Sequence, residues 1–191
     1  ESGAVVAEVD MPPHQPSAGG GGSGVSVIMV SFHTGEVLEY AIARVLAQEE
    51  LKELILVDNG NPPEVLTRLQ SWAEQEPKLK LLTGHGNIGF AAACNKGAKA
   101  ASGAYVLLLN PDCLLNAGTF APLTAILNAY PNAKLVGANI VNADGTPQRA
   151  ARRELLTPIT ALAESLGLHR LMNVKRLNTH EQLMPFSPLV V

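Results

Sequence analysis

In the stretch VLLLNPD (residues 106–112), an apolar run leads through an Asn-Pro step to a lone carboxylate. Short aliphatic runs bounded by turn residues are typical of strands buried within a sheet. The stretch LILVD (residues 54–58) has the same form, with Asp58 directly after the run. Parallel strands present their carboxyl ends along one edge of a sheet, where ligands bind in such folds. Asp58 and Asp112 are therefore predicted to share one edge and one ligand cleft.

Apolar runs and helical patterns alternate along the chain on either side of these two stretches. The runs predict strands over residues 25–31, 54–57, 79–82, 105–109 and 135–141. Apolar residues at helical spacing predict helices over residues 37–46, 62–73, 90–101 and 120–130. Alternation of this kind predicts an α/β fold, in which a mostly parallel sheet carries helices on both faces.

The two ends of the chain differ in composition from its middle. Residues 1–24 are rich in Gly, Pro and Ser, and they are predicted to form a disordered tail because their apolar area is too small to offset the backbone entropy. Toward the other end, a turn is predicted over residues 142–145 and a helix over 159–168. The apolar run at 185–191 predicts that the domain is truncated, since chain termini are normally solvated.

Composition narrows the classes of function. Hydrophobic residues make up 47% of the 191 residues, which is enough for one compact domain. The net charge of −3, without a block of basic residues, argues against a nucleic-acid partner. Cys94 and Cys113 lack a C-x-x-C spacing, as expected of reduced thiols in a cytoplasmic protein. No apolar stretch approaches the roughly 20 residues of a membrane span, and no signal-peptide pattern is found, so at most peripheral contact with the inner membrane face is predicted.

The stretch GHGNIG (residues 84–89) matches the G-x-G-x-x-G pattern of dinucleotide-binding folds. It follows a predicted strand, opens a predicted helix, and has Asp112 further along the chain. Two features argue against an NAD(P) site: the pattern lies in the third strand–helix unit, and the acid stands beyond an Asn-Pro step. Glycines that merely allow a tight turn and close helix packing account for the same letters. A phosphate near this loop is compatible with either interpretation, because helix N-termini present unpaired N–H groups.

Each aspartate also has a purely structural interpretation. Asp58 precedes Asn-Gly and is a favoured turn residue, and Asp112 is a candidate N-cap for a short helix. What favours a functional role is convergence: Ser31, Asp58, the loop 84–89 and Asp112 all follow predicted parallel strands. His33 and His85 lie at the same edge, but no metal-ligand spacing links the histidines, and the motifs of serine hydrolases and P-loop enzymes are missing.

Four blocks of sequence together resemble a known family. They are VSVIMVSF (25–32), VDNG (57–60), NIGFAAACNKG (87–97) and LLNPD (108–112). In order and spacing they resemble the N-terminal, nucleotide-sugar-binding half of a family-two inverting glycosyltransferase with a GT-A fold, in particular the rhamnosyltransferase-like branch active in cell-surface polysaccharide biosynthesis. The resemblance covers residues 25–153. It implies that residues 154–191 begin an acceptor-side region that is incomplete here.

The resemblance implies a donor and a set of binding residues. Ser31 and Phe32 would border the nucleotide base, and Asp58 would accept a hydrogen bond from the base N3–H, which selects a UDP- or dTDP-linked sugar. The positions implied for the ribose and the diphosphate are Asn87, Gly89, Asn95 and Asn110. The sugar would pass, with inversion, to a hydroxyl group on a glycan or lipid-linked acceptor.

The resemblance also implies a divalent cation. Asp112 would hold Mg²⁺ or Mn²⁺ together with the diphosphate oxygens, which are hard ligands suited to these ions. Family members often carry Asp-x-Asp where this chain has Asn110-Pro111-Asp112. One carboxylate fewer implies weaker binding of metal when the nucleotide is absent.

A catalytic base is the part of the family pattern that this chain lacks. Inverting transfer needs a group that takes the proton of the acceptor hydroxyl. The acidic residues after Asp112 stand singly, without the family's acidic motif: Asp144, Glu154, Glu164 and Glu181. The chain is therefore expected to bind donor without turning it over. An NAD(P)-dependent oxidoreductase and a non-catalytic nucleotide-binding module remain as alternatives.

Overall fold

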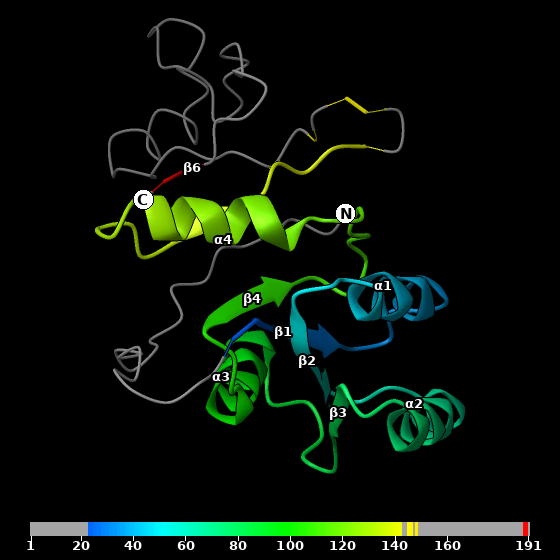
Figure 1. The fold of residues 1–191 in the computed structure, drawn as a ribbon. Helices are drawn as coiled ribbons and strands as arrows, with labels where there is room; N and C mark the ends of the chain where they lie inside the picture. The colour runs from blue at the N-terminus through cyan, green and yellow to red at the C-terminus, as the bar shows by residue number, and fades with distance from the viewer. Residues whose placement is uncertain (1–22, 143–144, 147, 149–188, 191) are drawn as a thin grey trace, which may run out of the picture. The chain divides into compact units, whose positions relative to one another are not determined.

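The computed structural model describes residues 23–142, 145–146, 148 and 189–190 (Figure 1). The chain divides into two compact units, Ala7–Ala125 and a second unit formed by Glu1–Val6 with Ile126–Val191. The predicted helix over 159–168 and nearly all of the predicted tail lie outside the described residues. No helix within these ranges has the length and apolar character needed to cross a membrane.

The first unit is built on a four-stranded parallel sheet, which confirms the predicted fold class. Its strands are β1 (Val25–Ser31), β2 (Leu51–Asp58), β3 (Leu79–Leu82) and β4 (Tyr105–Leu109), in the order β3-β2-β1-β4. Three of the strands have their predicted bounds. The strand β2 begins earlier than predicted: Lys52 and Glu53 interrupt the apolar run, but Leu51 and Glu53 still pair with β1.

Helices cover both faces of this sheet. Figure 1 shows α1 (Val37–Leu46) and α2 (Pro63–Gln75) on one face and α3 (Phe90–Ala100) on the other. Alternate residues of a strand point to opposite faces, and β1 illustrates the division. Val27 and Met29 pack in the cluster that contains the buried side of α1, whereas Ile28 and Val30 pack with α3.

The helix α3 approaches the sheet closely because it carries small residues on its buried side. Ala93 and Cys94 are buried there, and both cysteines of the chain are free thiols. A Cβ atom added to Gly97 would lie 2.5 Å from Ile28 Cγ2, closer than any real contact. Glycine at this position therefore sets the distance between helix and sheet, which in turn places the start of α3 at the edge where β2 ends.

In the second unit, β5 (Val136–Gly137) pairs antiparallel with β6 (Leu189–Val190), and α4 (Phe120–Ala129) crosses the boundary between the units. The predicted strand over 135–141 is wrong in its length. Leu135 and Val141 are 59% and 46% exposed, so the apolar run has no buried face that would extend the ladder. The ends of the turn predicted over residues 142–145 are joined, because the Gly145 N–H donates to Asn142 O at 2.9 Å.

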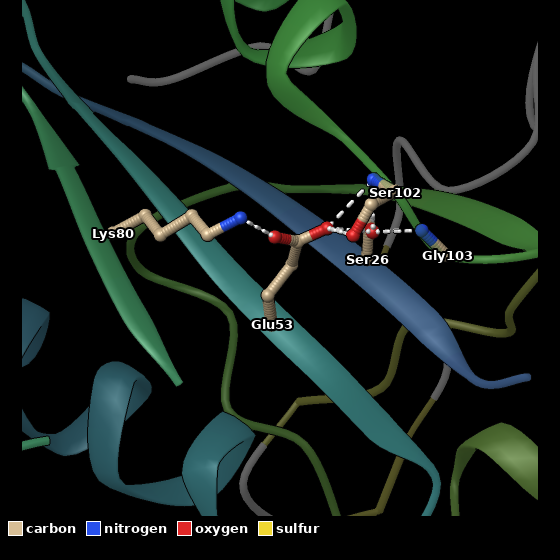
Figure 2. Close-up of polar contacts among 5 residues, drawn as sticks. All are labelled: Ser26, Glu53, Lys80, Ser102 and Gly103. Carbon is tan, nitrogen blue, oxygen red and sulfur yellow. Dashed lines mark hydrogen bonds and ion pairs between the residues drawn. The ribbon is translucent and has the colours of Figure 1, made fainter. Parts of the chain in front are cut away.

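A buried carboxylate ties three of the strands, near their amino ends, to the connection that precedes β4. Figure 2 shows Glu53 of β2 between Lys80 of β3 on one side and Ser26 of β1 with Ser102 on the other. Its Oε1 accepts from Ser26 Oγ, Ser102 N and Ser102 Oγ, each at 2.7 Å, while Lys80 Nζ forms an ion pair with Oε2. The Gly103 N–H donates to Ser26 Oγ at 2.8 Å. The connection from α3 to β4 is thereby fixed to the sheet.

These contacts change the acidity of Glu53. Burial by itself raises the pKa of the carboxyl group, but the Lys80 ammonium and the serine donors outweigh it and lower the pKa to about 2 from an ordinary value of 4.5. A carboxylate with a depressed pKa stabilises the fold above its unfolded pKa, and this contribution is lost as the pH falls through the folded value. Glu53 therefore stabilises the sheet at neutral pH and ceases to do so between about pH 4.5 and pH 2.

We expect Glu53→Gln to lower the free energy of unfolding at pH 7 by about 3 kcal/mol, the energy equivalent of the pKa shift. The variant should also lose less stability than the parent chain between pH 4.5 and pH 2. Urea denaturation at several pH values measures both effects. Glu74→Gln, on an exposed side of α2, is the matched control and should change neither. An undiminished pH dependence in Glu53→Gln would contradict the assignment.

Candidate functional site

The carboxyl ends of the strands meet at one edge of the sheet, as predicted. In the parallel register of β1 and β2, Ser31 is the partner of Asp58, and both are buried. The strand β1 also pairs with β4, which leads into the loop that carries Asp112. Because β1 lies between β2 and β4, the segments after all three strands emerge side by side. The convergence of the two aspartates on one edge is thus present in the structure.

Asp58 organises the turn that follows β2. Its Oδ1 accepts from Gly60 N at 3.3 Å, Asn61 N at 2.9 Å and Asn61 Nδ2 at 2.8 Å, and its Oδ2 accepts from Thr83 Oγ1 at 2.8 Å. The structural interpretation of Asp58 as a turn residue is therefore correct. A carboxylate offers about four lone-pair sites on its two oxygens, so Oδ2 retains capacity for one further donor.

The electrostatics of this carboxylate follow from its contacts. Asp58 is 5% exposed, and burial alone raises the pKa of its carboxyl group. The donors from Asn61, Thr83 and Gly60 outweigh burial and hold the pKa below its ordinary value. Asp58 is consequently an anion at neutral pH, and a charged oxygen such as Oδ2 is a strong hydrogen-bond acceptor.

A second side chain of the same turn holds the loop 84–89 in place. Asn59 is 3% exposed; its Oδ1 accepts from Ile88 N at 3.1 Å, and its Nδ2 donates to Asn87 Oδ1 at 2.9 Å. Asn87 Oδ1 also accepts from Gly89 N at 2.9 Å. Reasoning from sequence missed Asn59, although it lies in the block VDNG. Its role depends on a loop far along the chain, for which the sequence carries no direct signal.

The base-side positions lie next to this turn. Phe32 follows Ser31 and is 51% exposed, and its ring lies within 3.5 Å of the place that a Cβ on Gly60 would take. His33 has a positive φ of 50° and packs edge-on against Phe32, with ring centroids 4.6 Å apart. Non-glycine residues in this conformation concentrate at turns and functional sites. An exposed aromatic face beside a buried acceptor is suited to a planar ring that carries an N–H group.

The start of α3 supplies groups that favour an anion. Gly89, with φ 83°, is the N-cap of this 11-residue helix, and a glycine provides no side chain to occupy the first N–H groups. The exposed Asn87 precedes it, and the half-buried Asn95 lies one and a half turns into the helix. Free N–H groups and the helix dipole both favour phosphate at such an end.

The loop after β4 carries Asn110 and Asp112. The Cys113 N–H donates to Asn110 O at 3.1 Å, which closes a turn and leaves the Asp112 side chain exposed. No helix follows in the described segment 113–119, so the interpretation of Asp112 as an N-cap is wrong. Burial, followed by the adjacent Asp112 charge, raises the pKa of the Cys113 thiol and keeps it protonated.

Gln48 fixes the far end of the same loop. It is 3% exposed, its Nε2 donates to Asn116 O at 2.8 Å, and its Oε1 accepts from Thr119 N at 3.1 Å. The buried Leu115 adds an apolar anchor. Reasoning from sequence did not single out Gln48, because a polar residue after a helix is normally solvated.

The carboxylates at this edge limit how a divalent cation could be bound. Within the described ranges, no three His, Cys, Asp or Glu side chains are grouped so that they could hold a metal. Asp112 is an exposed carboxylate on an anchored loop, however, and Mg²⁺ is commonly bound through one or two carboxylates plus substrate phosphates and water. The donor set fits a cation that arrives with a diphosphate, and it does not fit a cation held by the protein alone.

Comparisons with known proteins agree with this arrangement. The sequence profile described as Glycosyl transferase family 2 matches residues 26–186, more than half of the chain. The N-acetylglucosaminyl-diphospho-decaprenol L-rhamnosyltransferase of Mycobacterium tuberculosis is 27% identical over 139 residues, 66% of this chain and 44% of that protein. The minor teichoic acid biosynthesis protein GgaB of Bacillus subtilis is 30% identical over 111 residues, 56% of this chain and 12% of that protein.

Two solved structures show the same fold. S. aureus TarS 1–349 in complex with UDP-GlcNAc gives a TM-score of 0.54 at 22% identity, over 66% of this chain and 37% of that one. The mannosyltransferase PcManGT of Pyrobaculum calidifontis, in complex with GDP-Man and Mn²⁺, gives 0.52 at 24% identity, over 67% and 37%. The chain spans less than half the length of each of these four proteins. From the profile match and a GT-A-like sheet with helices on both faces, we conclude that this chain belongs to Glycosyl transferase family 2.

Proposed function

We propose that the chain forms the donor-binding part of an inverting glycosyltransferase that uses a UDP- or dTDP-linked sugar. The observation that carries this proposal is the turn after β2, where buried Asp58 retains acceptor capacity at Oδ2 and the exposed ring of Phe32 lies near Gly60. Family membership and the resemblance of the fold to TarS, solved with UDP-GlcNAc, support it.

In this proposal, each loop that follows a carboxyl end of a strand contacts a different part of the donor. Ser31 and Phe32 border the base, and Asp58 Oδ2 accepts its N3–H. The ribose and diphosphate lie along Asn87, Gly89 and Asn95 at the start of α3, with Asn110 on the opposite side. The Asn59 contacts hold the Asn87 side chain and the Gly89 N–H in one arrangement before the donor arrives, which reduces the entropy lost on binding.

Asp112 is the residue that would hold a divalent cation with the diphosphate. When bound, Mg²⁺ or Mn²⁺ would neutralise the charge that develops on the departing nucleoside diphosphate. The N–H groups at the start of α3 act on the same charge from the protein side. PcManGT, of similar fold, has been solved with GDP-Man and Mn²⁺.

Transfer itself would be a single displacement at the anomeric carbon. The acceptor hydroxyl oxygen forms a bond to this carbon, the bond to the diphosphate oxygen breaks, and a general base takes the hydroxyl proton. No acidic pair follows Asp112 in this sequence. We infer that the 191-residue chain binds donor without turnover.

The class of acceptor is proposed from the names of two relatives. One is named for a diphospho-decaprenol substrate and another for teichoic acid biosynthesis. A glycan or lipid-linked hydroxyl acceptor is consistent with both. It would place the transfer reaction at the inner membrane face, with the donor supplied from the cytoplasm.

Two alternative functions give different results in a binding experiment. An NAD(P)-dependent oxidoreductase would rely on the glycines of loop 84–89. In the structure this loop follows β3, a strand at the border of the described sheet, and Asn59 fixes it. A non-catalytic nucleotide-binding module would make the same contacts to the nucleotide. Its binding of the diphosphate would not need to depend on a metal.

Isothermal titration separates these functions. We expect UDP or dTDP with Mn²⁺ to bind at least about tenfold more tightly than NADH, because Asp58 selects a pyrimidine N3–H and Asp112 selects a metal diphosphate. Mn²⁺ without nucleotide should show no measurable binding. Tight binding of NADH that is independent of metal would contradict the proposal.

Asp112→Asn tests the metal site. In the parent chain Mn²⁺ should tighten UDP binding, whereas in the variant the ratio of UDP affinities with and without Mn²⁺ should fall below about twofold, since a neutral amide is a poor ligand for a hard cation. Glu74→Gln is the matched exposed control and should keep the parent ratio. A metal effect that survives in Asp112→Asn would assign the cation to another residue.

Asn59→Ala tests the anchoring of loop 84–89. Loss of two hydrogen bonds, each contributing about 1 kcal/mol, should weaken UDP binding by about tenfold or more while circular dichroism shows an intact fold. The exposed Asn116 uses its backbone carbonyl rather than its side chain, so Asn116→Ala is the control. Equal affinities in the two variants would show that loop position does not limit binding.

A further inference from the structure

His85, in the middle of loop 84–89, has a side chain that its surroundings leave unsatisfied. Neither Nδ1 nor Nε2 is accessible to solvent, and neither has a hydrogen-bond partner. Among the residues that the structure describes, every other buried side-chain nitrogen or oxygen atom has a hydrogen-bond partner. Leaving a buried polar group unpaired costs about 1–3 kcal/mol, so a histidine kept at such a position calls for a physical reason.

The loop around His85 is held on both sides. On one side Thr83 donates to Asp58 Oδ2, and on the other Asn59 binds Asn87 and Ile88. Gly84 and Gly86, which flank the histidine, have φ of 84° and 64°, a region that favours glycine. The backbone on each side of His85 is thus fixed next to the turn that carries the base acceptor, and loop 84–89 lies at the edge where the donor is proposed to bind.

We propose that His85 is a specificity-determining residue that hydrogen-bonds the 2′-hydroxyl of the donor ribose, so that the site prefers ribonucleotides to 2′-deoxyribonucleotides. This inference rests on the proposed donor site and adds to it. It decides between the two donor classes in favour of the UDP-linked sugar.

The chemistry of the imidazole favours a hydroxyl over the other parts of a nucleotide. A neutral imidazole has one N–H donor and one acceptor nitrogen. A hydroxyl group both donates and accepts, so it pairs with either nitrogen in either tautomer, whereas a phosphate oxygen pairs only with the N–H. Within a nucleoside diphosphate, the hydroxyl groups are those of the ribose. A site whose buried polar groups require a hydroxyl discriminates against an analogue that lacks it.

The test compares UDP with 2′-deoxy-UDP, each with Mn²⁺, on the 191-residue chain and on two variants. For the parent chain we expect UDP to bind about tenfold more tightly than 2′-deoxy-UDP, which corresponds to one hydrogen bond to a buried group. His85→Phe keeps a planar ring without nitrogens, and its ratio should fall below about twofold. His85→Gln keeps a donor and an acceptor and should retain part of the preference. Tyr40→Leu, at an exposed position on α1, should keep the full ratio.

A second readout separates ribose recognition from a packing role. Because Phe removes two unpaired buried nitrogens, the nucleotide-free His85→Phe protein should melt at the parent temperature or above it. A histidine that only fills space predicts an unchanged ratio of affinities, and that result would overturn the inference. If the parent chain binds UDP and 2′-deoxy-UDP equally, the inference about His85 is overturned by that measurement alone. The proposed function would remain intact. If neither nucleotide binds, the proposed donor site itself fails.

Discussion

The complete burial of β1 is the constraint on which the first unit depends. All seven residues of this strand are buried, because β2 and β4 pair with it on both sides and α1 and α3 cover its two faces. A strand in this position has no edge or face left for solvent, and its neighbours run parallel to it. Their carboxyl ends then emerge together, and every candidate site residue follows from this arrangement.

The strand β2 carries a carboxylate near each end, and the two serve different purposes. Glu53, near the amino end, is enclosed by donors from three other segments, and its role is to stabilise the sheet. Asp58, at the carboxyl end, also has a lowered pKa, but it retains acceptor capacity at Oδ2, at the edge where the loops converge. Stability and ligand binding are thus placed at opposite ends of one strand, so that the binding edge can contain the strained and exposed groups that recognition needs.

Side chains, rather than regular structure, hold the loops of the site. Asn59 positions the loop before α3, Asp58 binds Thr83, and Gln48 fixes the segment after Asp112. Loops held in this way can present backbone N–H groups and an exposed carboxylate without paying ordering entropy when a ligand arrives. The same contacts fix the backbone on both sides of His85, whose buried ring nitrogens have no hydrogen-bond partner.

Local pattern in the sequence was sufficient to predict the strands and helices of the first unit and the parallel direction of its strands. The bounds of β1, β3 and β4 and the edge shared by Asp58 and Asp112 follow from aliphatic runs alternating with helical spacing, which report burial directly. The site contacts of Asn59, Thr83 and Gln48 could not be read in this way, since each joins residues more than 20 positions apart. The apolar run 135–141 forms a strand only over Val136–Gly137 for the same reason: a strand requires a partner, and whether one is adjacent depends on the folded chain and not on the run itself.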